Sequence, residues 1–190
     1  MTRILFFDTE TTGKAVFHKS ALDDCQPRLV QLAAILMENE REMESVNILV
    51  QPPMSIPPDA AAIHGISNEQ VERLGVSPTN AAYLFRDLAA CSDVIVAHNL
   101  QYDKLVMTKA LDECRIPPIP WEQIKQRCTM LAATPVTKLQ TVRGYKWPKL
   151  EECMWFFFEE HLQGAHDALV DVRACIRVYQ KLEQLGAFHD

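Results

Sequence analysis

Near its N-terminus the chain reads Ile4-Leu5-Phe6-Phe7-Asp8-Thr9-Glu10-Thr11-Thr12-Gly13. The apolar residues before Asp8 predict a buried β-strand, and in a strand the side chains of residues i and i+2 lie on the same face. Asp8 and Glu10 therefore place two carboxylates side by side at a strand end, where they repel each other unless a cation neutralises them. Oxygen ligands of this kind favour Mg²⁺ or Mn²⁺ over zinc.

A second acid follows another predicted strand. Residues 93–97 are typical of a short buried strand, and residues 98–103 after it open a helix. If this strand runs parallel to the first, Asp103 lies near the same strand ends as Asp8. Sites in open α/β sheets form at the carboxyl ends of strands. The sequence therefore predicts that Asp103 joins the first two carboxylates.

His166 and Asp171 mark the start of the last predicted helix. Five residues apart, their side chains would point about 140° away from each other if both residues were helical. They can converge if His166 lies in the loop that precedes the helix and only Asp171 belongs to it.

Four motifs, in this order, resemble those of the DEDDh, or DnaQ-like, 3′→5′ exonucleases. They are Asp8-Thr9-Glu10-Thr11-Thr12-Gly13, Ile63-His64-Gly65-Ile66, His98-Asn99-x-x-x-Asp103 and His166-x-x-x-x-Asp171. The family includes the proofreading subunit of the bacterial replicative polymerase and RNase T. The resemblance extends over residues 3–182, and four motifs in order are far more specific than one.

The resemblance implies an RNase H-like α/β fold, with a mixed five-stranded sheet flanked by helices. It also implies a metal-dependent enzyme that hydrolyses single-stranded DNA, or RNA, from the 3′ end to nucleoside 5′-monophosphates. Two Mg²⁺ or Mn²⁺ ions would be held by Asp8, Glu10, Asp103 and Asp171, with Asp8 bridging both, and His166 would be the general base. The alternative is a set of ordinary surface acids with a capping histidine.

Residues beside the acids are candidate substrate contacts. The backbone of Thr11, Thr12 and Gly13 could approach the terminal sugar, and Gly13 permits a tight turn. In the family the segment with His64 lies beside the terminal nucleotide, although a loop histidine held by local hydrogen bonds is an equal alternative. Asn99 either braces the site from behind or caps the helix that follows.

A basic and aromatic run occupies residues 138–149 and contains no acid. Its cations and aromatic residues are Lys138, Arg143, Tyr145, Lys146, Trp147 and Lys149. Such a run could hold a single-stranded backbone and stack on bases, so Lys146, Trp147 and Lys149 are candidate substrate contacts. A solvated loop in front of a helix is the alternative.

The composition is that of an ordinary globular protein, with 190 residues of which 48% are hydrophobic and 23% charged. This length predicts one exonuclease domain over residues 1–190. No run of 18 apolar residues and no signal peptide is present, so we expect no membrane span and a cytoplasmic location. Six cysteines without a CxxC pair predict reduced, buried thiols. The net charge of −6 argues against a nucleic-acid ligand, but bound divalent ions would reverse the charge locally.

Hydrophobic periodicity and breaker residues predict the order of the elements. Strands are expected at residues 3–9, 28–37, 44–51, 93–97 and 124–129, and helices at residues 68–73, 78–90, 100–114, 148–158 and 166–184, with a short helix after residue 129. The first three strands have short connections and should be antiparallel neighbours. Four prolines between residues 52 and 58 are expected to exclude regular structure there.

The expected partner is the 3′ end of a single-stranded nucleic acid. Residues 184–188 (Gln-Leu-Gly-Ala-Phe) resemble a sliding-clamp-binding pentapeptide, although a frayed tail explains them equally well. A polymerase partner has only weak support as well, because the chain ends soon after the last helix. The rival functions are an RNA-trimming or short-oligonucleotide exoribonuclease and a non-catalytic nucleic-acid-binding module of the same fold.

Overall fold

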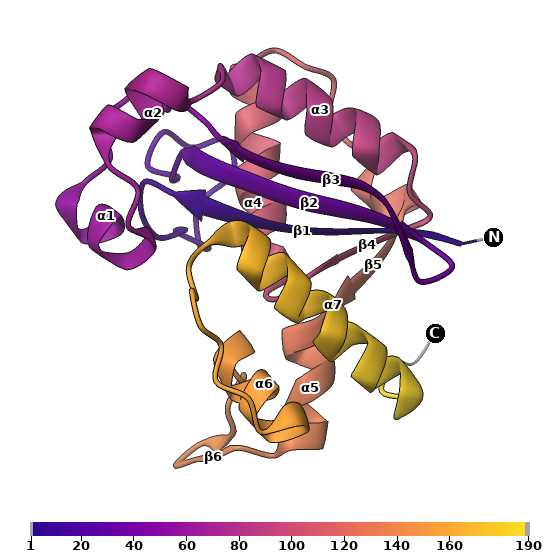
Figure 1. The fold of residues 1–190 in the computed structure, drawn as a ribbon. Coiled ribbons are helices and arrows are strands. Elements are labelled where there is room, and N and C mark those ends of the chain that lie inside the picture. The colour runs from indigo at the N-terminus through magenta and orange to yellow at the C-terminus, as the bar shows by residue number, and fades with distance from the viewer. Residues whose placement is uncertain (1, 189–190) are drawn as a thin grey trace.

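The computed structural model describes residues 2–188, which form a five-stranded sheet with helices on both faces (Figure 1). The strands are β1 (Arg3–Thr11), β2 (Leu29–Glu38), β3 (Arg41–Leu49), β4 (Val94–Ala97) and β5 (Lys125–Cys128), in the spatial order β3-β2-β1-β4-β5. β2 is antiparallel to both β1 and β3, whereas β4 is parallel to both β1 and β5. The predicted mixed sheet, with three antiparallel strands first, is confirmed.

The helices divide between the two faces of this sheet. They are α1 (Pro58–His64), α2 (Asn68–Leu74), α3 (Pro78–Ala90), α4 (Leu100–Glu113), the short η1 (Trp121–Gln123), α5 (Thr129–Thr137), α6 (Leu150–Phe158) and α7 (Ala168–Gln184). α3 and α4 pack on one face, and α7 covers the other with α5 and α6 beside it (Figure 1).

The alternation of side chains along β1 decides which residues face which helix. Phe7 packs on Phe85 of α3, with ring centroids 4.7 Å apart, whereas Phe6 meets Tyr179 of α7 at 5.1 Å. Because every second residue of a strand shares a face, the two carboxylates that follow at positions 8 and 10 point to the α7 side. The N-terminus of α7 is where Asp171 lies.

Two segments differ from the sequence-based expectation. The prolines of residues 52–58 do not exclude regular structure, because α1 begins at Pro58. Proline is favoured at the first helical position, where its missing N–H has no intrahelical partner to lose. Residues 138–149 are not a simple loop, because β6 (Gln140–Thr141) and β7 (Gly144–Tyr145) form a small hairpin within it.

Other expectations hold with shifted boundaries. β1 continues two residues beyond the predicted end, to Thr11, and α7 begins at Ala168, so His166 lies in the loop before it. The expectation of buried thiols is correct only in part. Cys153 and Cys175 are buried, two other cysteines are partly buried, and the remaining two are exposed. In the described residues no helix is long and apolar enough to cross a membrane.

Candidate active site

A cleft of about 550 Å³ opens at the carboxyl ends of β1 and β4. Its walls come from distant parts of the chain: the end of β1, the start of α4, the segment before α6 and the loop before α7. All five residues that the motifs predicted to be catalytic line it, namely Asp8, Glu10, Asp103, His166 and Asp171. The fold therefore brings together in one cavity the residues that the sequence scattered over most of its length.

Asp103 is fixed by the strand that carries the other two acids. It is 2% exposed, and its Oδ1 accepts hydrogen bonds from the backbone N of Thr9 at 3.1 Å and from the Thr9 hydroxyl at 2.7 Å. Thr9 lies between Asp8 and Glu10, so one residue joins the first motif to the third. The sequence pattern does not predict this role for Thr9, and the position of Thr9 between two acids is its only signal there.

His166 and Asp171 converge because the backbone bends sharply before α7. His166 has a φ of 70°, and its backbone N donates to Oδ2 of Asp171 at 3.1 Å. One ring nitrogen of His166 and one carboxylate oxygen from each of Glu10 and Asp171 all lie within 4.8 Å of one another. This left-handed conformation of a non-glycine residue is the kind of local strain that often accompanies functional sites.

The electrostatics of the cleft disfavour several charged carboxylates together. Burial, followed by repulsion from the other acids, raises the pKa of Glu10 to about 8 and that of Asp8 well above its usual range. Burial also raises the pKa of Asp103 to about 7, although the hydrogen bonds from Thr9 oppose the shift. Burial raises the pKa of Asp171 as well. Without a bound cation, the fold therefore holds these carboxylates so close together that their charged forms are destabilised.

The same donor set fits a divalent cation. Oδ1 of Asp171 is buried and has no hydrogen-bond partner among the described residues, so an acceptor is left over inside the cleft. Carboxylate oxygens are the ligands that Mg²⁺ and Mn²⁺ prefer, and a bound cation would remove the repulsion between them. Because one imidazole nitrogen also lies within the group, His166 is close enough either to assist catalysis or to serve as a ligand.

His98 holds the segment before α6, which forms one wall of the cleft. One ring nitrogen lies 2.9 Å from the Thr129 hydroxyl, and the other lies 2.9 Å from the carbonyl oxygen of Pro148. Burial lowers the pKa of His98 to about 4, so the ring is neutral and keeps both contacts at neutral pH. His98 thus ties the end of β4 to the segment before α6. The motif that contains His98 does not predict these contacts.

Asn99 does not cap α4 with its side chain. Its backbone is left-handed, with φ 75° and ψ 46°, and its side chain makes no capping hydrogen bond. The residue lines the cleft. Asn99 therefore occupies the N-cap position of α4 as expected, but the expected capping hydrogen bond of its side chain is absent, and a contact within the site stays a prediction.

The residues just after Glu10 point inward rather than into the cleft. The Thr11 hydroxyl lies 2.5 Å from the Tyr102 hydroxyl, and the Tyr102 hydroxyl donates to the carbonyl oxygen of Gly13 at 2.7 Å. The Thr12 hydroxyl accepts from the backbone N of Arg28 at 2.9 Å. Gly13 does not adopt a positive φ, so the turn expected there does not require glycine.

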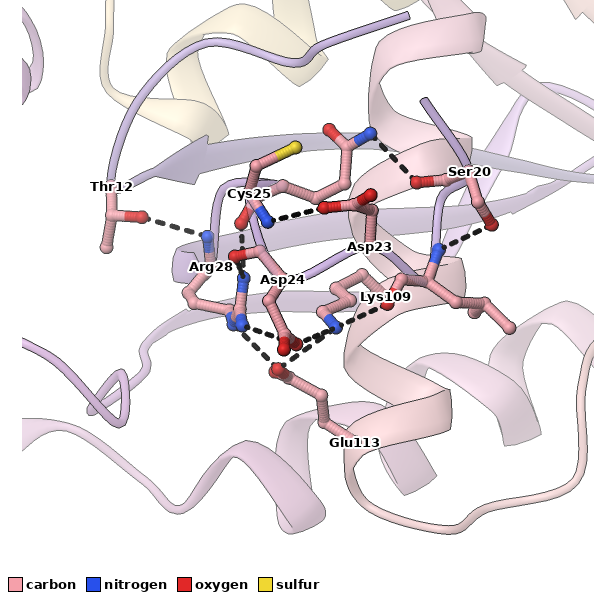
Figure 2. A network of polar contacts seen from close by, with 10 residues as sticks. Thr12, Ser20, Asp23, Asp24, Cys25, Arg28, Lys109 and Glu113 are labelled. Atoms are coloured by element: carbon pink, nitrogen blue, oxygen red, sulfur yellow. Dashed lines mark hydrogen bonds and ion pairs between the residues drawn. The ribbon is translucent and has the colours of Figure 1, made fainter. Parts of the chain in front are cut away.

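A charged network continues this anchoring and holds the segment after β1 against α4 (Figure 2). Arg28 forms an ion pair with Glu113 at 2.7 Å. Lys109 is 3% exposed, and its Nζ lies 2.9 Å from the carbonyl oxygen of Leu22 and 3.4 Å from both Glu113 and Asp24. The strand end that carries the acids is thereby fixed relative to the helix that carries Asp103.

His64 lies at the C-terminus of α1, where Gly65, with φ 73°, ends the helix. Its Nδ1 accepts from the backbone N of Ile66 at 3.0 Å, and burial lowers its pKa. His64 does not line the cleft, but it lies close enough to Thr11 and His166 for both residues to influence its pKa. A contact with substrate stays a prediction.

The basic run before α6 has a smaller effective charge than its sequence indicates. Lys146 pairs with Glu152 at 2.5 Å, and Lys149 pairs with Glu151 at 3.1 Å, so acids of the following helix offset both cations. Trp147 and Lys149 line the cleft, whereas Lys146 does not. The indole of Trp147 is 65% exposed and is free to meet a ligand.

The predicted clamp-binding segment is partly folded onto the domain. The ring of Phe188 packs on Tyr179 of α7, with centroids 5.0 Å apart, and the guanidinium of Arg127 lies 4.7 Å from its centre. Leu185 in the same segment is exposed. Clamp binding stays a prediction, and it would require Phe188 to leave this contact.

The architecture matches that of known exonucleases. Escherichia coli exonuclease I in complex with a dT13 oligonucleotide superposes with a TM-score of 0.78 and 20% sequence identity, over 96% of this chain and 41% of that chain. The zinc-bound form of the complex of exonuclease I with single-stranded DNA gives a TM-score of 0.77 at 22% identity, over 97% of this chain and 41% of that one. The fold is therefore RNase H-like, as predicted.

Curated relatives are similar over almost the whole chain. A Mycobacterium tuberculosis (strain CDC 1551 / Oshkosh) protein provisionally named a bifunctional exonuclease/endonuclease is 29% identical over 190 residues, which is 97% of this chain and 27% of that protein. The 3′-5′ exonuclease DinG of Bacillus subtilis (strain 168) is 25% identical over 187 residues, which is 96% of this chain and 18% of DinG. The chain thus spans about a quarter or less of the length of these relatives.

A family model described as Exonuclease matches residues 5–179. The chain belongs to this family, the DnaQ-like 3′→5′ exonucleases that its four motifs resemble. It is accordingly a hydrolase of the nuclease class.

Proposed function

We propose that the domain removes nucleotides one at a time from the 3′ end of single-stranded DNA and releases nucleoside 5′-monophosphates. The observation that carries this proposal is the convergence of Glu10, His166 and Asp171, whose ligand atoms lie within 4.8 Å of one another beside Asp8 and Asp103. The solved structures of exonuclease I with dT13 and dA16 favour single-stranded DNA as the substrate class.

Asp8, Glu10, Asp103 and Asp171 would hold two Mg²⁺ or Mn²⁺ ions in this proposal. The raised pKa values of these acids and the unpaired Oδ1 of Asp171 support the assignment. A bound cation would stabilise the charged carboxylates and would give this oxygen a partner. When bound, such ions offset the negative charge that develops on the phosphate during hydrolysis. The protein contributes the fixed positions, through the Thr9 bonds to Asp103 and the backbone bend at His166.

His166 would be the general base. Its imidazole lies at the exposed side of the cleft, where water can reach it, and an imidazole nitrogen can accept a proton from that water. A water oxygen attacks the last phosphorus and gives a proton to His166, while the bond from phosphorus to the 3′ oxygen of the preceding nucleotide breaks and that oxygen takes up a proton from solvent. The products are a nucleoside 5′-monophosphate and a strand that is one residue shorter, with a new 3′ hydroxyl.

A direct assay tests the proposal. 5′-labelled single-stranded and duplex DNA and RNA of matched sequence are incubated with Mn²⁺ or Mg²⁺, with a chelator, and with the Asp8→Asn protein as the inactive control. We expect a ladder that shortens by one nucleotide on single-stranded DNA and stops with chelator. Faster digestion of RNA would assign an exoribonuclease instead. Binding without cleavage in any metal would assign a non-catalytic module.

A further inference from the structure

A second groove, of about 570 Å³, lies along β5 and the start of α5. It shares three lining residues with the catalytic cleft, namely Asn99, Met130 and Trp147, so the two cavities border each other at these residues, which we call the junction. The similar volumes mean that the groove is as large as the cleft itself. Neither the catalytic residues nor the anchoring contacts described above use it.

Hydrogen bonds of His98 hold the junction between the two cavities in place. Pro148, next to Trp147, is held by the neutral ring of His98, which also contacts the hydroxyl of Thr129 at the start of α5. Asn99 stands there with a left-handed backbone and a side chain that makes no capping hydrogen bond. The indole of Trp147 and the side-chain amide of Asn99 therefore lie next to backbone that the contacts of His98 hold in place.

The groove differs from the cleft in charge. The cleft is lined by five acids, the four of the motifs together with Glu151, whereas no aspartate or glutamate is among the described residues that line the groove. Lys125 and Arg127 of β5 line it, and the charge of Arg127 is offset by an ion pair with Glu183 at 2.9 Å. Phosphates that follow the scissile one meet repulsion in the cleft and none from the lining of the groove.

Its apolar surface suits unpaired bases. Two large apolar side chains that line it are exposed, Leu131 at 52% and Trp147 at 65%. Bases of a single strand stack on such surfaces without regard to sequence, whereas the paired bases of a duplex present no free faces.

We propose that this groove binds the single strand upstream of the nucleotide being removed, with the chain passing over Trp147 and Asn99 from the cleft into the groove. The inference rests on the proposed function, and it also predicts how affinity depends on substrate length. Affinity should increase with the length of the substrate until the groove is filled, and the increase should depend on the groove and not on the catalytic acids.

Binding measurements test this without turnover. The Asp8→Asn protein is titrated into 5′-fluorescein oligothymidylates from the dinucleotide to the dodecamer, and the Kd is followed by anisotropy. We expect the dodecamer to bind much more tightly than the dinucleotide. Trp147→Ala should weaken binding of the dodecamer by about 5- to 150-fold, the range that corresponds to loss of one stacked base.

Leu131→Glu is the decisive variant, because Leu131 lines the groove and not the cleft. A carboxylate there should abolish most of the gain in affinity between dinucleotide and dodecamer. Leu74→Glu makes the same change at a position that is 65% exposed on α2, away from both cavities, and should keep the gain in full.

Two results overturn the inference: a Kd that does not depend on length, and a length dependence that Leu131→Glu leaves intact. The second would assign the groove to another occupant, such as a protein segment. Failure of the proposed function is a separate observation, because it would appear as absence of cleavage by the wild-type protein at every length while these Kd values remain measurable.

Discussion

The hydroxyl of Thr9 donates to Oδ1 of Asp103 at 2.7 Å across 94 residues of sequence. The backbone N of Thr9 donates to the same oxygen at 3.1 Å. These two bonds join the end of β1 to the first turn of α4, and they orient a carboxylate that is almost completely buried. The position of Asp103 relative to Asp8 and Glu10 therefore depends on Thr9.

Thr9→Val should lower metal affinity or turnover by roughly 10- to 100-fold, the usual effect of removing a partner that orients a metal ligand. Valine keeps the shape of threonine and removes only the hydroxyl. Thr9→Ser keeps the hydroxyl and should retain most of the activity. Mn²⁺ titration and steady-state kinetics measure both variants. Equal activity of the valine and serine variants would show that the bond does not matter.

The metal-free protein should lose stability as the pH rises. The pKa of Glu10 is raised to about 8 and that of Asp103 to about 7, so the folded state binds these protons more tightly than the unfolded chain does. Their stabilising contribution is present in acid, below the ordinary pKa values, and is lost as the pH rises through about 7 to 8. We expect a lower Tm at about pH 9 than at about pH 6 in chelator.

Added Mn²⁺ should reverse this trend, because metal ligands bind in their deprotonated form. Glu10→Gln removes one of the titrating groups and should flatten the pH dependence in chelator. A wild-type Tm that rises from acid to alkaline pH without metal would contradict the proposed state of these carboxylates.

His166→Ala should reduce turnover by about 10²- to 10⁴-fold, the typical contribution of a general base. If His166 is only the base, Mn²⁺ affinity measured by calorimetry should change little. Its ring nitrogen is close enough to Glu10 and Asp171 for the alternative to be tested directly. A large loss of Mn²⁺ affinity would make His166 a ligand and remove it from the role of base.

The sequence predicted the elements of this site well, because they depend on local patterns. The apolar run before Asp8 and the acids two residues apart sufficed to predict a strand end with two carboxylates on one face. The requirement that His166 lie outside the last helix followed from helix geometry, and α7 does begin after it, at Ala168.

The sequence could not predict the contacts that fix the site, because these join residues far apart in the chain. The bond from Thr9 to Asp103, the contact of His98 with Pro148, and the pairing of Lys146 with Glu152 all depend on the tertiary fold. The pairing of Lys146 with Glu152 explains why residues 138–149 carry less effective positive charge than their sequence indicates. The acids that offset its lysines come in the next helix.

Lys149 and Lys146 should therefore differ in their effect on substrate. Both lysines are paired with an acid of α6, but Lys149 lines the cleft and Lys146 does not. Lys149→Gln should raise KM and reduce the salt slope of binding by roughly 0.7 if one phosphate contact to a single strand is lost. Lys146→Gln serves as the matched control, with a slope close to wild type. Identical slopes for wild type and Lys149→Gln would show that Lys149 does not contact phosphate.

Asp8→Asn tests the central claim, that these acids are held together in order to bind catalytic metal ions. Activity on 5′-labelled single-stranded DNA with Mn²⁺ and the Tm in chelator at about pH 8 are measured on the same preparation. We predict loss of nearly all activity together with a folded state that has a higher Tm than the wild type, because one source of repulsion is gone. A variant that retains substantial activity, or that loses activity only because it is less stable than the wild type, would contradict the account.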